Sequence, residues 1–284
     1  MLVTLNDVLP AARREGRAVG AFNVGNYETL LIVARAAEAA GRPVIVQLYN
    51  RLLDNGHGEP LAAAARVLAG RASVPMVLHL DHGASVAQVE RALAAGFTSA
   101  MLDLSREPFE ENVARVREAL KLARAAGASL EAEIGHVPMG DGDRALTTPE
   151  EARRFYEAAG VDALAVAIGT AHGFYRETPE VDVELARGIA RVVPVPLVLH
   201  GGSGTPAASV RAAVASGVAK VNVATEFQFA YQSRLRERLI ETGDKFVAAD
   251  LLQAPVVDQC VPYVESWIRF LDGSAAGPGG GMST

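Results

Sequence analysis

Eight short apolar segments recur along this chain, and stretches with helical periodicity separate them. The segments span residues 18–23, 44–49, 76–80, 98–102, 129–134, 163–168, 197–199 and 220–223. Two of the helical stretches, 27–40 and 110–126, end at a glycine, which is a common helix stop signal. Strands that alternate with helices indicate βαβ units and a parallel sheet. Eight such units, each of roughly thirty residues, predict an α/β fold of the (β/α)8 or TIM barrel type.

The main alternative is a doubly wound open sheet. That fold would place a glycine-rich dinucleotide fingerprint after the first strand, and the segment NVGNY at 23–27 lacks one. Continuous Val, Ile and Leu runs also indicate strands that are buried on both faces, as in a barrel. We therefore expect one barrel domain over residues 1–272. The composition of residues 273–284, rich in Gly, Ser and Ala, predicts a flexible tail.

Composition excludes several classes of function. The chain has 284 residues, of which 50% are hydrophobic and 21% charged, as in ordinary globular proteins. A net charge of −6 without a dense basic cluster argues against nucleic-acid binding. No segment reaches the ~18 apolar residues of a membrane span, and the first residues lack the pattern of a signal peptide. The single Cys260 cannot form an internal disulfide, so we expect a cytoplasmic protein.

Polar side chains stand where the apolar segments end. In order along the chain they are Asn23, Gln47, Asp81 with His82, Asp103, Glu133, His172, His200 and Asn222. For any one of these residues alone, a loop cap is the favoured interpretation. The carboxyl ends of barrel strands share one mouth, so eight such strand ends together favour an active site there. His79 is predicted to be a packed core histidine and His57 a surface loop residue, while His136 stays open.

Three of the six histidines belong to this set. His82, His172 and His200 each follow a predicted strand, so their imidazoles can converge on one ion. Neutral imidazoles suit a divalent transition metal, most often zinc, with one coordination position left for substrate.

Two glycine-bearing segments add a phosphate site and a lid to this prediction. GGSG at 201–204 follows the seventh predicted strand, and NVAT at 222–225 ends the eighth. Loops at these places commonly bind phosphate through backbone N–H groups, and Ser203 and Thr225 add hydroxyls. Residues 135–142 carry Asp141, with Asp143 just beyond. They are interpreted as a lid that brings a carboxylate over the site, with a solvated loop as the equal alternative.

These motifs resemble those of the class II, zinc-dependent ketose-bisphosphate aldolases, which include fructose-1,6- and tagatose-1,6-bisphosphate aldolases. The motifs are HLDHG at 79–83, MLDLS at 101–105, PFEEN at 108–112, EAEIG at 131–135, VAIGTAHG at 166–173, LHGGSG at 199–204 and KVNVAT at 220–225. The resemblance spans residues 2–271, and 165–172 and 220–226 are closest to the tagatose-type branch. It implies a carbon–carbon lyase of carbohydrate metabolism that reversibly cleaves a phosphorylated ketose to dihydroxyacetone phosphate and an aldehyde. It also implies a homodimer or homotetramer.

The resemblance also implies roles for individual residues. Zinc would be held by His82, His172 and His200, and Asp103 and Glu133 would line the position of the metal or of a second divalent ion. Asp81 would be the acid/base for the aldehyde half, and Asp141 the best match to the loop carboxylate. The substrate and its phosphate would be bound by Gly173, Gly201, Gly202, Ser203, Asn222, Ala224 and Thr225, with Asn222 near the reacting carbons. The backbone carbonyls of Gly173 and Gly201 resemble a monovalent-cation site for Na⁺ or K⁺.

Two segments depart from the family pattern. The predicted lid lacks the usual Gly-Gly pair, and Tyr49 and Arg51 replace small residues at the end of the second predicted strand. These changes favour a phosphorylated ketose related to, but different from, fructose 1,6-bisphosphate.

Three other hypotheses remain at this point. One is a zinc-dependent hydrolase or isomerase that acts on a sugar phosphate. A second is a protein that binds a sugar phosphate without turning it over. A third is an aldolase that forms a Schiff base on Lys220, which lies two residues before Asn222 and so points to the same side of its strand.

Overall fold

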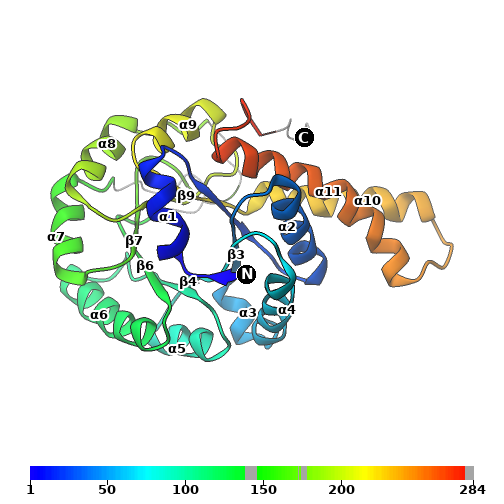
Figure 1. Cartoon of the computed structure of the whole chain (residues 1–284), viewed down its shortest axis with the longest axis horizontal. Coiled ribbons are helices and arrows are strands. Elements are labelled where there is room, and N and C mark those ends of the chain that lie inside the picture. Colours follow the sequence, from blue (N-terminus) through cyan, green and yellow to red (C-terminus); the bar gives the residue numbers. More distant parts are fainter. Residues whose placement is uncertain (138–145, 172, 174–177, 279–284) are drawn as a thin grey trace.

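The computed structural model describes all residues except 138–145, 172, 174–177 and 279–284. Its central element is a closed barrel of eight parallel strands (Figure 1). The barrel strands are β2 (Val19–Asn23), β3 (Val44–Tyr49), β4 (Met76–Gly83), β5 (Ser99–Leu102), β6 (Ser129–Ile134), β7 (Ala163–Val166), β8 (Leu197–Leu199) and β9 (Val218–Val223). Each strand pairs in parallel with the next, and β9 pairs with β2.

This architecture confirms the predicted TIM barrel, and the strand bounds show where the sequence was less informative. Strand β4 continues to Gly83, beyond the predicted end at residue 80, so Asp81 and His82 belong to the strand itself. A further strand, β1 (Leu2–Val3), pairs with the start of β4 and was not predicted, because two residues carry no periodicity.

The described residues form eleven helices, and most of them surround the barrel in an outer layer (Figure 1). They are α1 (Leu5–Arg14), α2 (Tyr27–Ala40), α3 (Asn50–Asp54), α4 (Gly58–Arg71), α5 (Val86–Ala94), α6 (Phe109–Ala125), α7 (Pro149–Ala159), α8 (Val183–Val192), α9 (Ala207–Ala215), α10 (Thr225–Thr242) and α11 (Ala249–Leu271). Helix α2 has the predicted bounds and ends at Gly41, whose φ of 64° suits a residue without Cβ. No helix among the described residues is long and apolar enough to cross a bilayer.

Helix α1 closes one end of the barrel and so fixes which end is open. It lies across the end nearest the viewer in Figure 1. Its buried Leu5, Val8 and Leu9 pack against inward-facing strand residues such as Ile45 and Val198. Because this end is filled by apolar side chains, the polar strand ends at the opposite mouth are left to form a cavity.

Removal of this plug is expected to destabilise the barrel. Leu9 is fully buried, so Leu9→Ala should lower the free energy of unfolding by about 2–5 kcal/mol through the cavity that it leaves. Val67→Ala, on the exposed side of α4, is the control and should change it by less than about 0.5 kcal/mol. Chemical denaturation of both variants measures this, and equal effects would contradict the proposed packing role of α1.

Candidate active site

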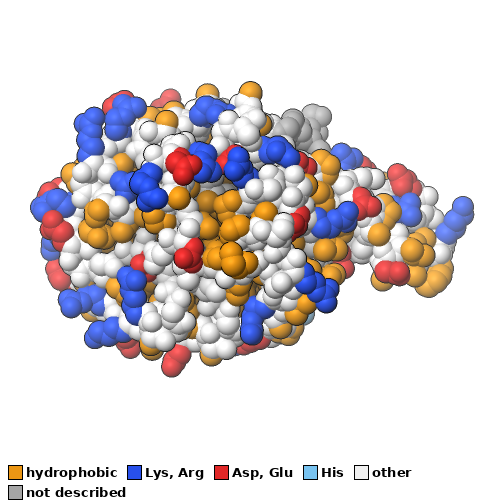
Figure 2. Space-filling model, in the orientation of Figure 1, with side chains coloured by type: hydrophobic (Ala, Val, Ile, Leu, Met, Phe, Trp, Pro, Cys, Tyr) orange, Lys and Arg blue, Asp and Glu red, His pale blue; other side chains and the backbone are white. Residues whose placement is uncertain are grey.

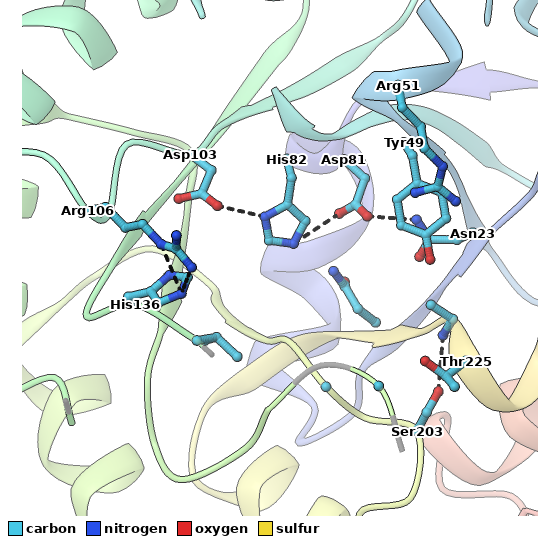
Figure 3. Close-up of a pocket in the computed structure, with 15 residues that line it drawn as sticks. Asn23, Tyr49, Arg51, Asp81, His82, Asp103, Arg106, His136, Ser203 and Thr225 are labelled. Carbon is cyan, nitrogen blue, oxygen red and sulfur yellow. Dashed lines mark hydrogen bonds and ion pairs between the residues drawn. The ribbon is translucent and has the colours of Figure 1, made fainter. Parts of the chain in front are cut away.

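The carboxyl ends of the barrel strands surround a cavity of about 390 Å³. Its described lining residues are Asn23, Tyr49, Arg51, Asp81, His82, Asp103, Arg106, His136, Val137, Gly173, Gly201, Ser203, Asn222, Ala224 and Thr225. Figure 3 shows Asp81 and His82 between two walls, one formed by Tyr49 and Arg51 and the other by Arg106 and His136. Of the predicted strand-end residues, Asn23, Asp81, His82, Asp103 and Asn222 line this cavity, as expected for parallel strands whose carboxyl ends share one mouth.

The backbone at the end of β4 is unusual and sets the direction of His82. His82 has a φ of 50°. Among the described residues, it is the only non-glycine residue with a positive φ. The pairing of β4 with β5 also shifts register between Leu80 and Gly83. A Cβ at Gly83 would lie 2.5 Å from the carbonyl oxygen of Met101, so only glycine fits there. Left-handed backbone at a non-glycine residue is costly and is typical of functional sites.

His82, Glu133 and His200 form a group with the dimensions of a metal site. One ligand atom from each lies within 4.8 Å of the others. Nε2 of His82 is 3.1 Å from Nδ1 of His200, which is 3.5 Å from Oε2 of Glu133. Two ligand atoms on one tetrahedral zinc ion are about 3.3 Å apart, as follows from zinc–nitrogen bonds of about 2.0–2.1 Å. Oε2 of Glu133 is buried and makes no hydrogen bond within the described residues, so these side chains fit a cation.

Each imidazole is held through its other ring nitrogen. Nδ1 of His82 lies 2.8 Å from Oδ2 of Asp103, and Nε2 of His200 lies 3.0 Å from Oε1 of Glu131. A carboxylate that accepts from one nitrogen leaves the lone pair of the other nitrogen for a metal. The structure therefore places Asp103 beside His82, outside the group of three, and its role as a ligand stays a prediction. Glu131 was not selected from the sequence.

The acidic groups around these imidazoles favour positive charge. Burial disfavours the cationic form of His82, but the nearby carboxylates of Asp81, Asp103 and Glu133 outweigh burial and raise its pKa to about 10. Burial, with the charge of Asp103 added, raises the pKa of Glu133 to about 8. The pKa of Asp103 is lowered, because its hydrogen bond to His82 outweighs burial. The site thus carries an excess of carboxylates that a divalent ion would neutralise.

A chain of amides positions the carboxylate of Asp81. Nδ2 of Asn23 donates to Oδ2 of Asp81 over 2.7 Å, and Nε2 of Gln47 donates to Oδ1 of Asn23 over 3.0 Å. Oδ1 of Asp81 has no hydrogen bond among the described residues and lies 3.9 Å from Nε2 of His82. Asp81 therefore presents one oriented oxygen beside the candidate metal group. Asn23 and Gln47 were recognised only as polar strand ends, since the sequence does not show which side chains meet.

The segments after β8 and β9 are joined where phosphate binding was predicted. Oγ of Ser203 accepts from the backbone N–H groups of Ala224 and Glu226, at 3.1 and 3.3 Å. The hydroxyl proton of Ser203 has no acceptor among the residues that the structure describes. Gly202 donates to the carbonyl of Asn222, and a Cβ on Gly202 would lie 2.7 Å from that oxygen. Helix α10 begins at the edge of the cavity, where Ala224 and Thr225 line it. Phosphate binding by these segments stays a prediction.

Two walls of the cavity contain cationic side chains that were not placed in the site beforehand. Cζ of Arg51 stacks 3.8 Å from the ring centroid of Tyr49. Nη2 of Arg106 lies 2.7 Å from Nε2 of His136, and Nδ1 of His136 lies 3.3 Å from Oγ of Ser105. His136, left open by the sequence, therefore lines the cavity. The replacement of small residues by Tyr49 and Arg51 was the only sequence signal for this wall.

Lys220 does not line the cavity. Its side chain is fully buried, and Nζ pairs with Oε2 of Glu131 at 2.8 Å. This contact does not favour a Schiff-base lysine. His172, Asp141 and Asp143 lie outside the described residues, so their predicted roles stay predictions.

Known proteins share both the sequence and the fold. The family described as "Fructose-bisphosphate aldolase class-II" matches residues 3–275. A fructose-bisphosphate aldolase from Thermus caldophilus is 39% identical, over 87% of this chain and 90% of that protein. The YdjI aldolase from Escherichia coli K12 superposes with a TM-score of 0.86 at 32% identity, over 99% of this chain and 100% of that one. A putative fructose-1,6-bisphosphate aldolase from Coccidioides immitis gives a TM-score of 0.83 at 31% identity, over 94% and 95% of the chains. The chain therefore belongs to the class II fructose-bisphosphate aldolase family and is a metal-dependent carbon–carbon lyase.

Proposed function

We propose that this aldolase reversibly cleaves a phosphorylated ketose, related to fructose or tagatose 1,6-bisphosphate, into dihydroxyacetone phosphate and an aldehyde. The observation that carries the proposal is the oriented carboxylate of Asp81 beside the His82, Glu133 and His200 group. An acid/base next to a cation is what aldol cleavage requires, because a proton must move while charge develops on the neighbouring carbons.

The metal set of the proposal is His82, His172 and His200. A zinc ion held there would supply a Lewis acid that polarises the substrate carbonyl. Glu133 and Asp103 would stabilise that charge or hold a second divalent ion, and the carbonyls of Gly173 and Gly201 would bind a monovalent cation. Support comes from the family and from the 3.1 Å approach of the His82 and His200 nitrogens.

Asp81 is the proposed acid/base for the aldehyde half. In the cleavage direction, Oδ1 would accept the proton of the substrate hydroxyl whose carbon becomes the aldehyde. In the synthetic direction the same oxygen would return it. Asn23 holds Oδ2, so the carboxylate presents Oδ1 without a search through rotamers.

The phosphate of the ketose half would bind at the start of α10. Backbone N–H groups at a helix N-terminus attract anions, and Gly201, Gly202, Ser203, Ala224 and Thr225 would surround the phosphate there. Asn222 would lie nearer the reacting carbons, since its side chain reaches the same cavity deeper in the barrel. Asp141 is retained as the proposed loop carboxylate.

Arg51 is the proposed specificity residue for the far end of the aldehyde half. Tyr49 pairs in register with Asp81, so this wall lies on the aldehyde side of the acid/base. No carboxylate among the described residues lies within 4.0 Å of the Arg51 guanidinium, while Tyr49 fixes it by stacking. A fixed guanidinium is suited to a phosphate or carboxylate on the aldehyde.

We also propose a homodimer or homotetramer that uses the α10–α11 hairpin. The hairpin extends away from the barrel, and its far end carries hydrophobic side chains (Figure 2). Phe246 is 93% exposed, and Ile240 and Leu251 are also exposed. Clustered exposed apolar residues mark interfaces between proteins. A cytoplasmic location completes the proposal and is consistent with the free, buried thiol of Cys260.

Isotope exchange tests the proposed reaction. The zinc-loaded protein should exchange solvent deuterium into dihydroxyacetone phosphate at the carbon next to the carbonyl, because an aldolase reversibly removes a proton from that carbon. Chelation should abolish the exchange, and Zn²⁺ or Co²⁺ should restore it. A hydrolase or a mere binder would not exchange, and an isomerase would release an isomeric product. Full exchange after exhaustive chelation, with a borohydride-trapped adduct on Lys220, would overturn the metal mechanism.

Substitutions separate the acid/base from the metal site. Asp81→Ala should retain zinc but lower turnover by roughly 10²-fold or more, as for a lost acid/base group. His200→Ala should lose zinc itself. Metal analysis with turnover measurements decides between the roles, and a zinc-free Asp81→Ala protein would show that Asp81 serves the metal instead.

Substitution of Arg51 tests the specificity wall. Arg51→Gln should lower kcat/KM for glyceraldehyde 3-phosphate by about 10- to 100-fold, the effect of one lost hydrogen bond to a charged group. Condensation with uncharged glyceraldehyde should be unchanged. Arg106→Gln, on the opposite wall, is the matched control. Equal losses with both aldehydes would contradict a role in recognising the anionic group.

Disruption of the hairpin tests the assembly. Phe246→Ser should shift the protein toward a smaller species in light scattering after size-exclusion chromatography. The substitution would remove an aromatic side chain that the proposed interface between subunits would bury. Val67→Ser, on the exposed face of α4, should leave the mass unchanged. A wild-type monomer would contradict the proposed assembly.

A further inference from the structure

A buried ionic cluster lies beneath the candidate metal group, inside the barrel. It consists of His79 on β4, Glu131 on β6, Lys220 on β9 and His200 just after β8, and all four side chains are fully buried. Glu131 is at its centre. Oε2 of Glu131 accepts from Nζ of Lys220 at 2.8 Å, and Oε1 accepts from Nε2 of His200 at 3.0 Å.

The stability of the barrel does not explain this cluster. A buried ion pair loses hydration, and apolar side chains of similar volume are often at least as stabilising. The surrounding inner layer of the barrel is indeed built from small and branched apolar residues such as Ile45, Val77 and Val198. A lysine and a glutamate in this layer therefore require another reason.

The geometry at His200 supplies one. An ionised carboxylate can only accept, so its contact with Nε2 places the His200 proton there. Nδ1 then directs its lone pair toward Nε2 of His82 and Oε2 of Glu133, where the metal is proposed to bind. Histidine ligands in metal sites are typically oriented in this way by a second carboxylate.

Lys220 maintains the position of Glu131. Within the described chain it is the only cation that forms an ion pair with this carboxylate, apart from contacts that depend on histidine protonation. Nε2 of His79 lies farther away, 3.6 Å from Oε2, and makes no hydrogen bond among the described residues. Without Lys220, Glu131 would be a buried charge without compensation, and its bond to His200 would not be fixed.

We propose that Lys220 is a positioning residue that, through Glu131, fixes the tautomer and direction of the His200 imidazole for metal binding. The proposal rests on the metal site of the proposed function. It gives the buried lysine a role in metal affinity that is separate from contact with substrate.

Zinc affinity provides the test. Apo proteins are titrated with Zn²⁺ against a chromophoric chelator, and the visible spectrum of the Co²⁺ form reports ligand geometry. Lys220→Met should weaken zinc binding by about 10- to 100-fold, as is usual for lost outer partners of metal ligands, and should alter the cobalt spectrum. Lys121→Met, on the exposed side of α6, is the matched control.

Two double variants make the test independent of how well Lys220→Met folds. Lys220→Met with Glu131→Gln removes both charges, and the Gln oxygen can still accept from His200 while its amide donates to His79. Lys220→Met with Glu131→Leu also lacks charge but offers His200 no acceptor. The Gln pair should keep zinc affinity near that of the wild type, and the Leu pair should lose about 10- to 100-fold.

The outcomes separate three interpretations. Equal zinc affinity and cobalt spectra in the two double variants would overturn the positioning role. An equal loss in Leu9→Ala, which is destabilised at the far end of the barrel, would show that the effect is one of general stability and would also overturn it. Failure of the wild type to bind zinc would refute the proposed metal site, and the positioning role with it.

Discussion

Closure of a parallel sheet is the constraint on which the rest of this molecule depends. Because β5 pairs with both β4 and β6, the eight barrel strands form a closed ring, and all of their pairings are parallel. All carboxyl ends then emerge at one mouth, where eight successive loops can contribute polar side chains to a small volume. The amino ends are sealed by α1, whose Leu9 fills the opposite opening. The cavity of about 390 Å³ is thus a consequence of the topology, and the side chains decide what it does.

The barrel interior changes character along its axis. Near α1 it holds uncharged and mostly apolar side chains, and toward the mouth it holds Glu131, Lys220 and His79 before the candidate metal group. Buried charge is tolerated there because each group has a partner, as between Lys220 and Glu131. This order suggests that the polar layer is tied to the site above it, since the lower layer shows that the fold can be filled without charge.

The strands of the barrel were more predictable from the sequence than the contacts between their side chains. The strands at 44–49 and 129–134 have their predicted bounds, because buried runs flanked by turn residues leave little choice of ends. Strand β4 was predicted too short, because the left-handed backbone at His82 cannot be inferred from side-chain pattern. The convergence of the strand-end residues was predictable from strand direction alone. The partners of Glu131 were not, since a period of two indicates which side chains share a face but not which of them meet across a barrel.

The two histidines of the candidate metal group, His82 and His200, are anchored in different surroundings, and this difference bears on their roles. The partner of His82 is Asp103, whose side chain is 19% exposed at the rim, whereas the partner of His200 is Glu131, which is fully buried. Water and substrate can compete for Asp103 but cannot reach Glu131. His82 is also in a strained backbone conformation and lies beside Asp81, the proposed acid/base, while His200 packs on the barrel core. A site of this kind can adjust at the substrate side while its inner ligand stays fixed. That division is suited to a metal that must hold its place as the substrate binds, reacts and leaves.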